Sequence, residues 1–337
     1  PIVYGRQGAR HAARDHPHQP TCGRANNYQE LAGHAHRKLL EREAKIMNSP
    51  VVLSAPAKIN LFLRITGRRD DGYHLLQTVF QFLDLEDEVR LWPRSDGQVV
   101  RVNDVEGVPP DDDLAIRAAR LLQAACGTSL GANIEVVKRI PMGGGLGGGS
   151  SDAATVLVGL NAVWKAGLGT DELATLGLTL GADVPVFVHG HATWAEGVGE
   201  EFTAIAIEQC HYLLAFPGVH VPTGVIFSSK DLTRDCEPLT IDGFPSHEGY
   251  RRARELMQAG NVCEAVVRRA HPDVDACLGW LESFAPARMT GTGSACFALV
   301  DNGTAIPAGR WESRRVRGLN VSPLLQQVEA YLHSGNN

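Results

Sequence analysis

The chain has 337 residues, of which 44% are hydrophobic and 21% charged, and its formal net charge is −6. This length suggests about two domains with a substantial core. The sequence contains no run of about 18 consecutive apolar residues, which argues against a membrane span. The acidic balance argues against broad, nonspecific nucleic-acid binding, so any anion site must be confined to a local pocket.

Residues 1–46 differ in composition from the rest of the chain. They hold five of the thirteen histidines, and Lys and Arg outnumber Asp and Glu. They lack the apolar segment of a secretory signal, and their histidines lack ordered metal-ligand spacing. We predict a disordered or non-native leader that does not join the core, with Met47 as the native start. A transit-like role is the alternative.

Cysteine usage indicates a reducing compartment. The seven cysteines are widely scattered and form no Cys-x-x-Cys pair. We therefore expect reduced thiols, packed as small hydrophobes, in a cytoplasmic protein.

From Val51 the sequence predicts strand, loop and strand. In residues 57–65, alternation places Lys58 and Asn60 on one face, together with Phe62 and Arg64. This face is either a polar outer surface or part of a functional site, and the spacing does not decide between them.

Residues 113–126 have the apolar spacing of a helix, and residues 133–137 form a predicted strand that leads into a glycine-rich loop. Residues 141–151 contain six glycines and run into a helix pattern, which we expect Ser150 or Ser151 to cap. Glycines before a helix N-terminus favour an anion pocket, although a flexible linker or tight turn remains the alternative. Neither a P-loop nor a dinucleotide fingerprint is present.

Two further segments are candidates for the site. A helix is predicted from Thr170 to a stop at Gly181, and Asp183 follows it among apolar residues. Asp183 could accept a hydroxyl proton beside a lysine, or it could cap the next turn. The glycine-bearing turn of residues 288–297 could close over phosphates from the opposite side, or it could be a routine turn.

Strand patterns at 212–216 and 295–300 surround a helix pattern, and the whole chain reads as a two-domain α+β protein with a boundary near residue 200. The segments at 56–61, 143–151, 180–185 and 290–293 together resemble, in order, the motifs of the GHMP small-molecule kinases. The resemblance covers about residues 51–330. It implies the two-domain GHMP kinase fold with an active site in the cleft between domains, an ATP-binding domain at 47–200 and a C-terminal domain at 201–337.

Within this family, segments such as 71–74, 77–84 and 195–199 resemble kinases of the methylerythritol phosphate (non-mevalonate) isoprenoid pathway. The resemblance implies ATP-dependent phosphorylation of the 2-hydroxyl of a cytidine diphosphate-linked methylerythritol. It assigns Asp183 as the catalytic base, which Lys58 keeps ionised. The implied substrate-binding residues are Asn60, Tyr73, His74, Asp183 and Phe227.

The resemblance also implies ATP and Mg²⁺, with metal ligands that the sequence does not assign. The implied ATP-binding residues are Lys138, Pro141, Met142, Gly143, Gly144, Gly145, Leu146, Gly147, Gly148, Gly149, Ser150 and Ser151. Asp113 departs from the asparagine that relatives often carry, which puts one nucleotide contact in doubt. We expect a small-molecule substrate, no nucleic-acid or membrane partner, and a monomer or weak homodimer.

The alternatives are a related mevalonate or homoserine kinase, or a nucleotide-binding sensor without turnover. The presence of both Lys58 and Asp183 argues against the sensor.

Overall fold

The computed structural model describes residues 49–244 and 246–334, and its central feature is a pair of long antiparallel strands. β1 (Val51–Arg68) pairs with β2 (His74–Arg94), and shifts in register interrupt the ladder at three places. Such irregularities bend a strand and change which way its side chains point. The predicted strand–loop–strand start is confirmed, whereas the predicted leader lies outside the described residues.

These strands belong to a ten-stranded sheet with the path β10-β11-β7-β12-β2-β4-β3, to which β1, β5 and β6 are added. The remaining strands are β3 (Val99–Arg101), β4 (Gly131–Val137), β5 (Thr193–Glu196), β6 (Glu201–Ala204), β7 (His211–Phe216), β10 (Ala287–Met289), β11 (Cys296–Val300) and β12 (Glu312–Leu319), with a separate hairpin of β8 (Ser246–His247) and β9 (Tyr250–Arg251). β12 pairs with both β2 and β7, so the sheet is continuous across residue 200. The domain boundary at that position stays a prediction.

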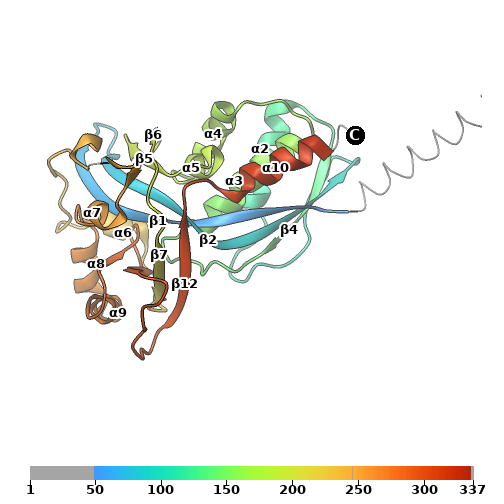
Figure 1. The fold of residues 1–337 in the computed structure, drawn as a ribbon. Coiled ribbons are helices and arrows are strands. Elements are labelled where there is room, and N and C mark those ends of the chain that lie inside the picture. Colours follow the sequence, from blue (N-terminus) through green and yellow to red (C-terminus); the bar gives the residue numbers. More distant parts are fainter. Residues whose placement is uncertain (1–48, 245, 335–337) are drawn as a thin grey trace, which may run out of the picture. The chain divides into compact units, whose positions relative to one another are not determined.

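The helices form two groups at opposite ends of the β1–β2 pair (Figure 1). The first group is α2 (Leu114–Cys126), α3 (Gly148–Val163), α4 (Thr170–Leu178), α5 (Val184–His189) and α10 (Pro323–Ser334). The second group is α6 (Thr223–Ser228), α7 (Ala253–Met257), α8 (Glu264–Ala270) and α9 (Pro272–Glu282), with a short 3₁₀ turn, η1 (Ile241–Gly243), between α6 and α7. None of the helices within the described residues is long and apolar enough to cross a membrane.

Helix α3 packs tightly on the sheet and thereby fixes the loop that precedes it. A Cβ added to Gly159 would lie 2.5 Å from a methyl carbon of Leu53 and 2.7 Å from one of Leu91. These separations are shorter than van der Waals contact, so only glycine permits this approach. The first group of helices shares one hydrophobic core with β1, β2 and β4. Two further core clusters lie around the middle of β1 and under α6, α8 and α9.

The predicted helix at 113–126 and strand at 133–137 are confirmed as α2 and β4. Asp113 is the N-cap of α2, and its carboxylate accepts a hydrogen bond from the backbone N–H of Ala115. Gly127 ends the helix with φ of 65°, a conformation that glycine adopts without a Cβ penalty.

Two predicted helix ends are wrong. Helix α3 begins at Gly148 behind an N-cap glycine, Gly147, at φ of 74°, so Ser150 and Ser151 lie inside its first turn and cap nothing. Helix α4 ends at Leu178, before Gly181, because the chain turns there through hydrogen bonds to carbonyls of the last helical turn. In both places the backbone geometry of the adjoining turn sets the end of the helix. The residue types that favour helix caps do not set it.

The cysteines that the structure describes are free thiols, and Cys210, Cys263, Cys277 and Cys296 are buried. The expectation that cysteines pack as small hydrophobes is confirmed for these four. Cys22 lies outside the described residues.

Candidate active site

The glycine-rich loop folds as a compact turn between β4 and α3. Gly143, Gly145 and Gly147 have φ values of 71°, 77° and 74°, and they alternate with residues of negative φ. Such alternation turns successive N–H groups toward a common side and forms an anion-binding concavity. The N-terminus of α3 adds unpaired N–H groups at the end of the same loop.

The second glycine turn lies directly against this loop, whereas its predicted closure over phosphates from the opposite side stays a prediction. The N–H of Ala295 donates to the carbonyl of Gly144 at 3.1 Å. A Cβ on Gly145 would lie 2.6 Å from the carbonyl oxygen of Thr290, so the two backbones are in contact. Segments that are about 145 residues apart in the sequence therefore form one wall.

Lys58, Asn60 and Asp183 meet beside this wall. The Lys58 ammonium donates to Asn60 Oδ1 at 2.6 Å and lies 3.3 Å from Asp183 Oδ2. Asn60 Nδ2 donates in turn to the hydroxyl of Thr78 at 2.9 Å, and that hydroxyl donates to the carbonyl of Phe62 at 2.5 Å. This chain of bonds fixes the orientation of the Asn60 amide and hence the position of the ammonium.

The polar outer surface that β1 alternation allowed is excluded. The Lys58 side chain is 3% exposed, and Asn60 is also buried. The Asp183 side chain is 37% exposed and stands at the N-cap position of α5, where it makes no capping hydrogen bond. Its carboxylate is therefore available to a ligand, and the alternative reading of Asp183 as a helix cap is wrong.

This polar group lines a cavity of about 950 Å³. Lys58, Asn60, Asp183, Ser150 and several loop glycines line it. Tyr73, His74 and Phe227 line it as well, and the rings of His74 and Phe227 stack with centroids 5.4 Å apart. Tyr73 is 65% exposed, so its ring is open to a ligand.

A second cavity of about 320 Å³ lies behind the glycine loop. Pro141, Met142, Leu146 and Lys138 line it together with the glycines, whereas Ser151 is buried. The Lys138 ammonium contacts two carboxylates, Asp87 at 2.5 Å and Asp152 at 2.6 Å. Lys138 thus borders this cavity, but its charge is already paired, and its approach to the nucleotide stays a prediction.

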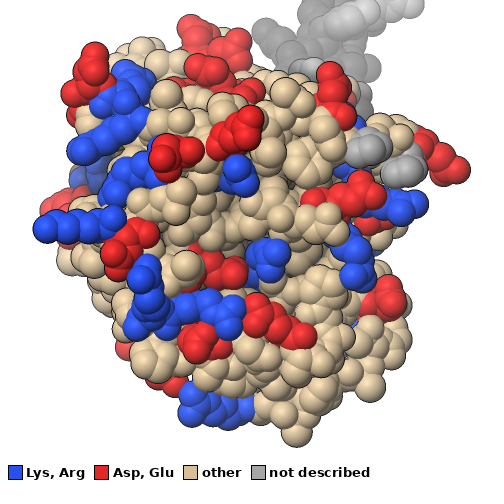
Figure 2. Space-filling model, turned by 90° about the vertical axis from the view of Figure 1, so that its left-hand side faces the viewer, with Lys and Arg blue, Asp and Glu red and all other residues tan. Residues whose placement is uncertain are grey.

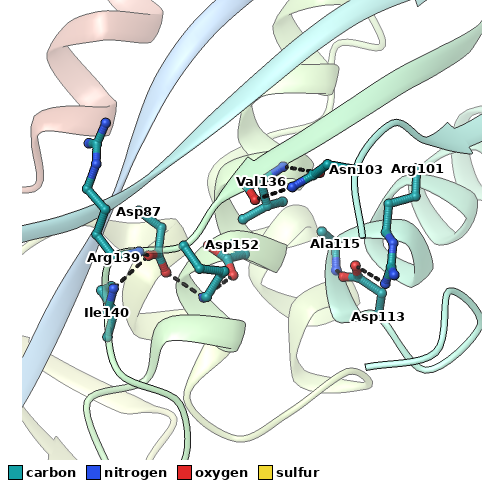
Figure 3. Close-up of polar contacts among 10 residues, drawn as sticks. Asp87, Arg101, Asn103, Asp113, Ala115, Val136, Arg139, Ile140 and Asp152 are labelled. Atoms are coloured by element: carbon teal, nitrogen blue, oxygen red, sulfur yellow. Dashed lines mark hydrogen bonds and ion pairs between the residues drawn. The ribbon is translucent and has the colours of Figure 1, made fainter. Parts of the chain in front are cut away.

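The two carboxylates differ in their surroundings (Figure 3). Asp87 accepts hydrogen bonds from the backbone N–H groups of Arg139 and Ile140, whereas Asp152 Oδ1 is buried without a partner among the described residues. Burial raises the pKa of Asp152 to about 7. Burial alone would lower the pKa of Lys138, but the two carboxylates outweigh it and raise that pKa. One ammonium shared by two carboxylates leaves one excess negative charge, so Asp152 is the group that takes a proton.

Asp113 occupies the edge of this second cavity. Its carboxylate accepts from Ala115 N–H and pairs with Arg101 at 3.2 Å (Figure 3). A carboxylate therefore fills the position where the resemblance implied an asparagine amide, and it is committed to a cap and an ion pair.

Sequence reasoning missed Thr78, Asp87 and Asp152. Asp87 and Lys138 are 51 residues apart, and no periodicity links them. Thr78 lies within the segment that resembled the family, but only the fold shows that its hydroxyl holds Asn60.

Comparison with known protein families identifies the class of protein. The N-terminal domain of GHMP kinases matches residues 113–191, and the C-terminal GHMP kinase domain matches residues 246–309. The chain belongs to the GHMP kinases, a family of two-domain α+β kinases.

Several similar proteins are known, and most of those described here share one name. A 4-diphosphocytidyl-2-C-methyl-D-erythritol kinase of Xanthomonas oryzae pv. oryzae is 52% identical over 296 residues, which cover 85% of this chain and 97% of the relative. An equally named protein of Nitrosococcus oceani is 49% identical over 281 residues, covering 82% and 97%. A crystal structure of 4-(cytidine 5'-diphospho)-2C-methyl-D-erythritol kinase matches with TM-score 0.65 and 31% identity over 79% of this chain and 98% of that one. Methanococcus jannaschii mevalonate kinase, at 14% identity and TM-score 0.59 over 81% and 99%, shares the fold.

Proposed function

We propose that this protein transfers the γ-phosphoryl group of ATP to the 2-hydroxyl of 4-diphosphocytidyl-2-C-methyl-D-erythritol, in the methylerythritol phosphate route to isoprenoid precursors. One observation carries the proposal: the Lys58–Asp183 pair lines one cavity together with the glycine-rich loop and with an aromatic end, formed by Tyr73, His74 and Phe227. The two relatives of about 50% identity and the solved structure at 31% identity are named as kinases of this compound.

In the proposed reaction Asp183 accepts the proton of the attacking hydroxyl. Its carboxylate is partly exposed, makes no cap, and lies beside a buried ammonium, so it can reach a ligand while Lys58 holds its position. Lys58 can also donate to the substrate oxygen, because an ammonium has three N–H donors and Asn60 occupies one. Asn60 acts by orienting this lysine, and it lines the cavity where substrate would contact it.

The glycine loop and the N-terminus of α3 bind the ATP phosphates. Loop N–H groups and the helix N-terminus supply partial positive charge without any side chain. The second cavity then takes the nucleoside part of ATP, with Lys138, Pro141 and Met142 along its wall.

The site fits an Mg²⁺ ion held mainly by phosphate oxygens and water. Ser150 and Asp183 line the same cavity and offer one hydroxyl and one carboxylate. No cluster of three or more His, Cys, Asp or Glu residues suited to a metal occurs in the described part of the chain. Mg²⁺ usually keeps several waters and needs few protein ligands, so this donor set suffices. When bound, it would neutralise charge on the transferred phosphoryl group.

The cytidyl group is assigned to the aromatic end of the larger cavity. Tyr73 and Phe227 offer ring faces on which a pyrimidine can stack, and His74 can hydrogen-bond its edge. This end favours the cytidyl compound over mevalonate or homoserine, which have no ring to stack.

The surface charges agree with binding of a small phosphorylated ligand in a local pocket. On the face at the α6–α9 end, the basic and acidic side chains drawn in colour are interspersed, and neither sign forms a continuous surface (Figure 2). A cytoplasmic location and a monomeric or weakly dimeric state stay predictions.

The test is ADP release by the purified protein with Mg-ATP and each of three acceptors, namely the cytidyl-methylerythritol compound, mevalonate and homoserine. Turnover with the cytidyl compound alone is expected. Turnover with another acceptor would overturn the substrate assignment and keep the kinase class. Absence of turnover with all three would reduce the proposal to nucleotide binding.

A further inference from the structure

Arg234, in the loop that follows α6, holds two walls of the aromatic end without lining the cavity itself. Its Nε donates to Nε2 of His74 at 3.0 Å. Its Nη2 donates to the carbonyl oxygens of Phe227 and Ser229 at 2.8 and 2.7 Å, and its Nη1 donates to that of Leu232 at 3.0 Å. One guanidinium therefore fixes the His74 ring together with the backbone of the residue whose ring stacks on it.

The chemistry of this contact determines where the His74 proton lies. A guanidinium carries five N–H donors and no acceptor, so Nε2 of His74 must present its lone pair to Arg234. The proton of the neutral imidazole is then on Nδ1. Within the described ranges Nδ1 has no hydrogen-bond partner in the protein, and His74 lines the cavity. The Nδ1–H group is therefore left to a ligand.

The charges around His74 also favour the neutral ring. Partial burial, Arg234 and Arg68 at the end of β1 all lower the pKa of His74 below its ordinary value of 6.5. Phe227, which stacks on the ring from α6, is uncharged. In the turn between β1 and β2, Asp71 is paired with Arg69 at 2.8 Å. A proton on Nε2 would remove the hydrogen bond and place a third cation beside two guanidinium groups.

We propose that Arg234 is a positioning residue that selects the neutral, Nδ1-protonated form of His74, so that the cavity presents one N–H donor to an acceptor on the edge of the pyrimidine base. This inference rests on the proposed function, because it assigns that donor to the cytidyl group. Cytosine carries acceptors at O2 and N3, whereas N3 of uracil carries a hydrogen. A single fixed donor at this place therefore contributes to the choice of base as well as to affinity.

The first experiment reads the tautomer directly. Long-range ¹⁵N–¹H correlation spectra of the wild-type protein with ¹⁵N-labelled histidine are recorded from pH 5 to 8, and His74→Gln identifies the His74 signals. We expect a neutral ring with hydrogen on Nδ1 at pH 7. Hydrogen on Nε2, or a charged ring at this pH, would overturn the inference whether or not a variant at Arg234 folds.

The second experiment removes the guanidinium. In Arg234→Met the Nδ1–H form loses the contact that selects it, so the KM for the cytidyl substrate at pH 8 should rise about tenfold relative to wild type. In this variant burial and Arg68 still lower the pKa of His74, so the pH is taken down to 5, where protonation of the ring places hydrogen on Nδ1 again and this ratio should fall. The KM for ATP should stay within about twofold at both pH values.

Arg315→Met is the matched control. Arg315 also anchors a loop through three carbonyl bonds, to Asp301, Asn302 and Thr304, but it contacts no histidine. Its loss should leave both KM values unchanged. A rise in the cytidyl KM of Arg234→Met that does not depend on pH, or an equal rise in the ATP KM, would show a merely structural role and overturn the inference.

Failure of this inference and failure of the proposed function give different results. Wild-type turnover of the cytidyl substrate with hydrogen on Nε2 of His74 would overturn the role of Arg234 alone. Absence of turnover would overturn the proposed function, and the recognition role of Arg234 with it.

Discussion

Replacing Asp183 with asparagine tests the centre of the proposed mechanism. The amide has nearly the same shape but cannot accept the hydroxyl proton, so kcat should fall about 10²- to 10⁴-fold. The KM for ATP should change little, because the glycine loop is untouched. Removing one partner of a buried ion pair costs about 3–5 kcal/mol. Here the cost should be about 1–2 kcal/mol, because Asp183 is 37% exposed and Lys58 keeps its bond to Asn60.

The assays are steady-state ADP release, ATP binding by calorimetry, and thermal unfolding of each variant. Asp273→Asn is the matched control, since it breaks an exposed pair between Asp273 and Arg310 at 2.7 Å on α9. It should leave kcat unchanged and shift stability by less than about 1 kcal/mol. Near-normal turnover of Asp183→Asn would refute the base assignment. A parallel loss of ATP affinity would show that the substitution damages the loop instead.

Three further predictions concern the loop, the aromatic end and the buried carboxylate. Gly145→Ala should destabilise the protein by about 2–4 kcal/mol in chemical unfolding and weaken ATP binding, because its Cβ would meet a backbone oxygen at 2.6 Å; Gly107→Ala, equally left-handed but in open space, should cost only about 1–2 kcal/mol. Phe227→Leu should raise the KM for the cytidyl substrate several-fold more than the KM for ATP, and equal effects on both would contradict the stacking role. Asp152, whose folded pKa of about 7 exceeds its ordinary 3.8, binds a proton preferentially in the folded state; its contribution to stability is therefore full below pH 3.8 and lost as pH rises through about 7. In urea unfolding, the free energy of unfolding should fall less with rising pH in Asp152→Asn than in wild type. An unchanged pH dependence would contradict the raised pKa of Asp152.

Much of the N-terminal half of the fold could be predicted because its elements carry local signals. The α2 helix combines an apolar stripe, an aspartate N-cap and a glycine at its end, so local preferences agree with the final structure. The start of α3 could not be predicted in this way. Its N-cap is a left-handed glycine, and the loop takes its geometry from contact with the turn at Thr290, which is remote in sequence.

The candidate site also combines features that local sequence patterns predict with features that depend on contacts remote in sequence. Alternation on β1 put Lys58 and Asn60 side by side, because residues two apart share a face. Whether that face met solvent or a cavity depended on the turn at 290–293 and on Asp183, which the fold brings to it from other segments. The contact between Arg234 and His74 joins residues 160 apart, and neither local propensity nor spacing could have predicted it.

The two cavities share the glycine loop as their partition, and this arrangement indicates what holds the polyphosphate. Gly143, Gly145 and Gly147 line both cavities. The lysines of the two cavities, Lys58 and Lys138, are each held by carboxylates before any ligand binds. Neither ammonium is then free to act as the main counter-charge of the phosphates, so backbone N–H groups of the loop and of the α3 N-terminus must supply much of the attraction. Because that attraction depends on φ values that only glycine adopts readily, a single added methyl group in the loop should weaken ATP binding more than loss of the charge on Lys138.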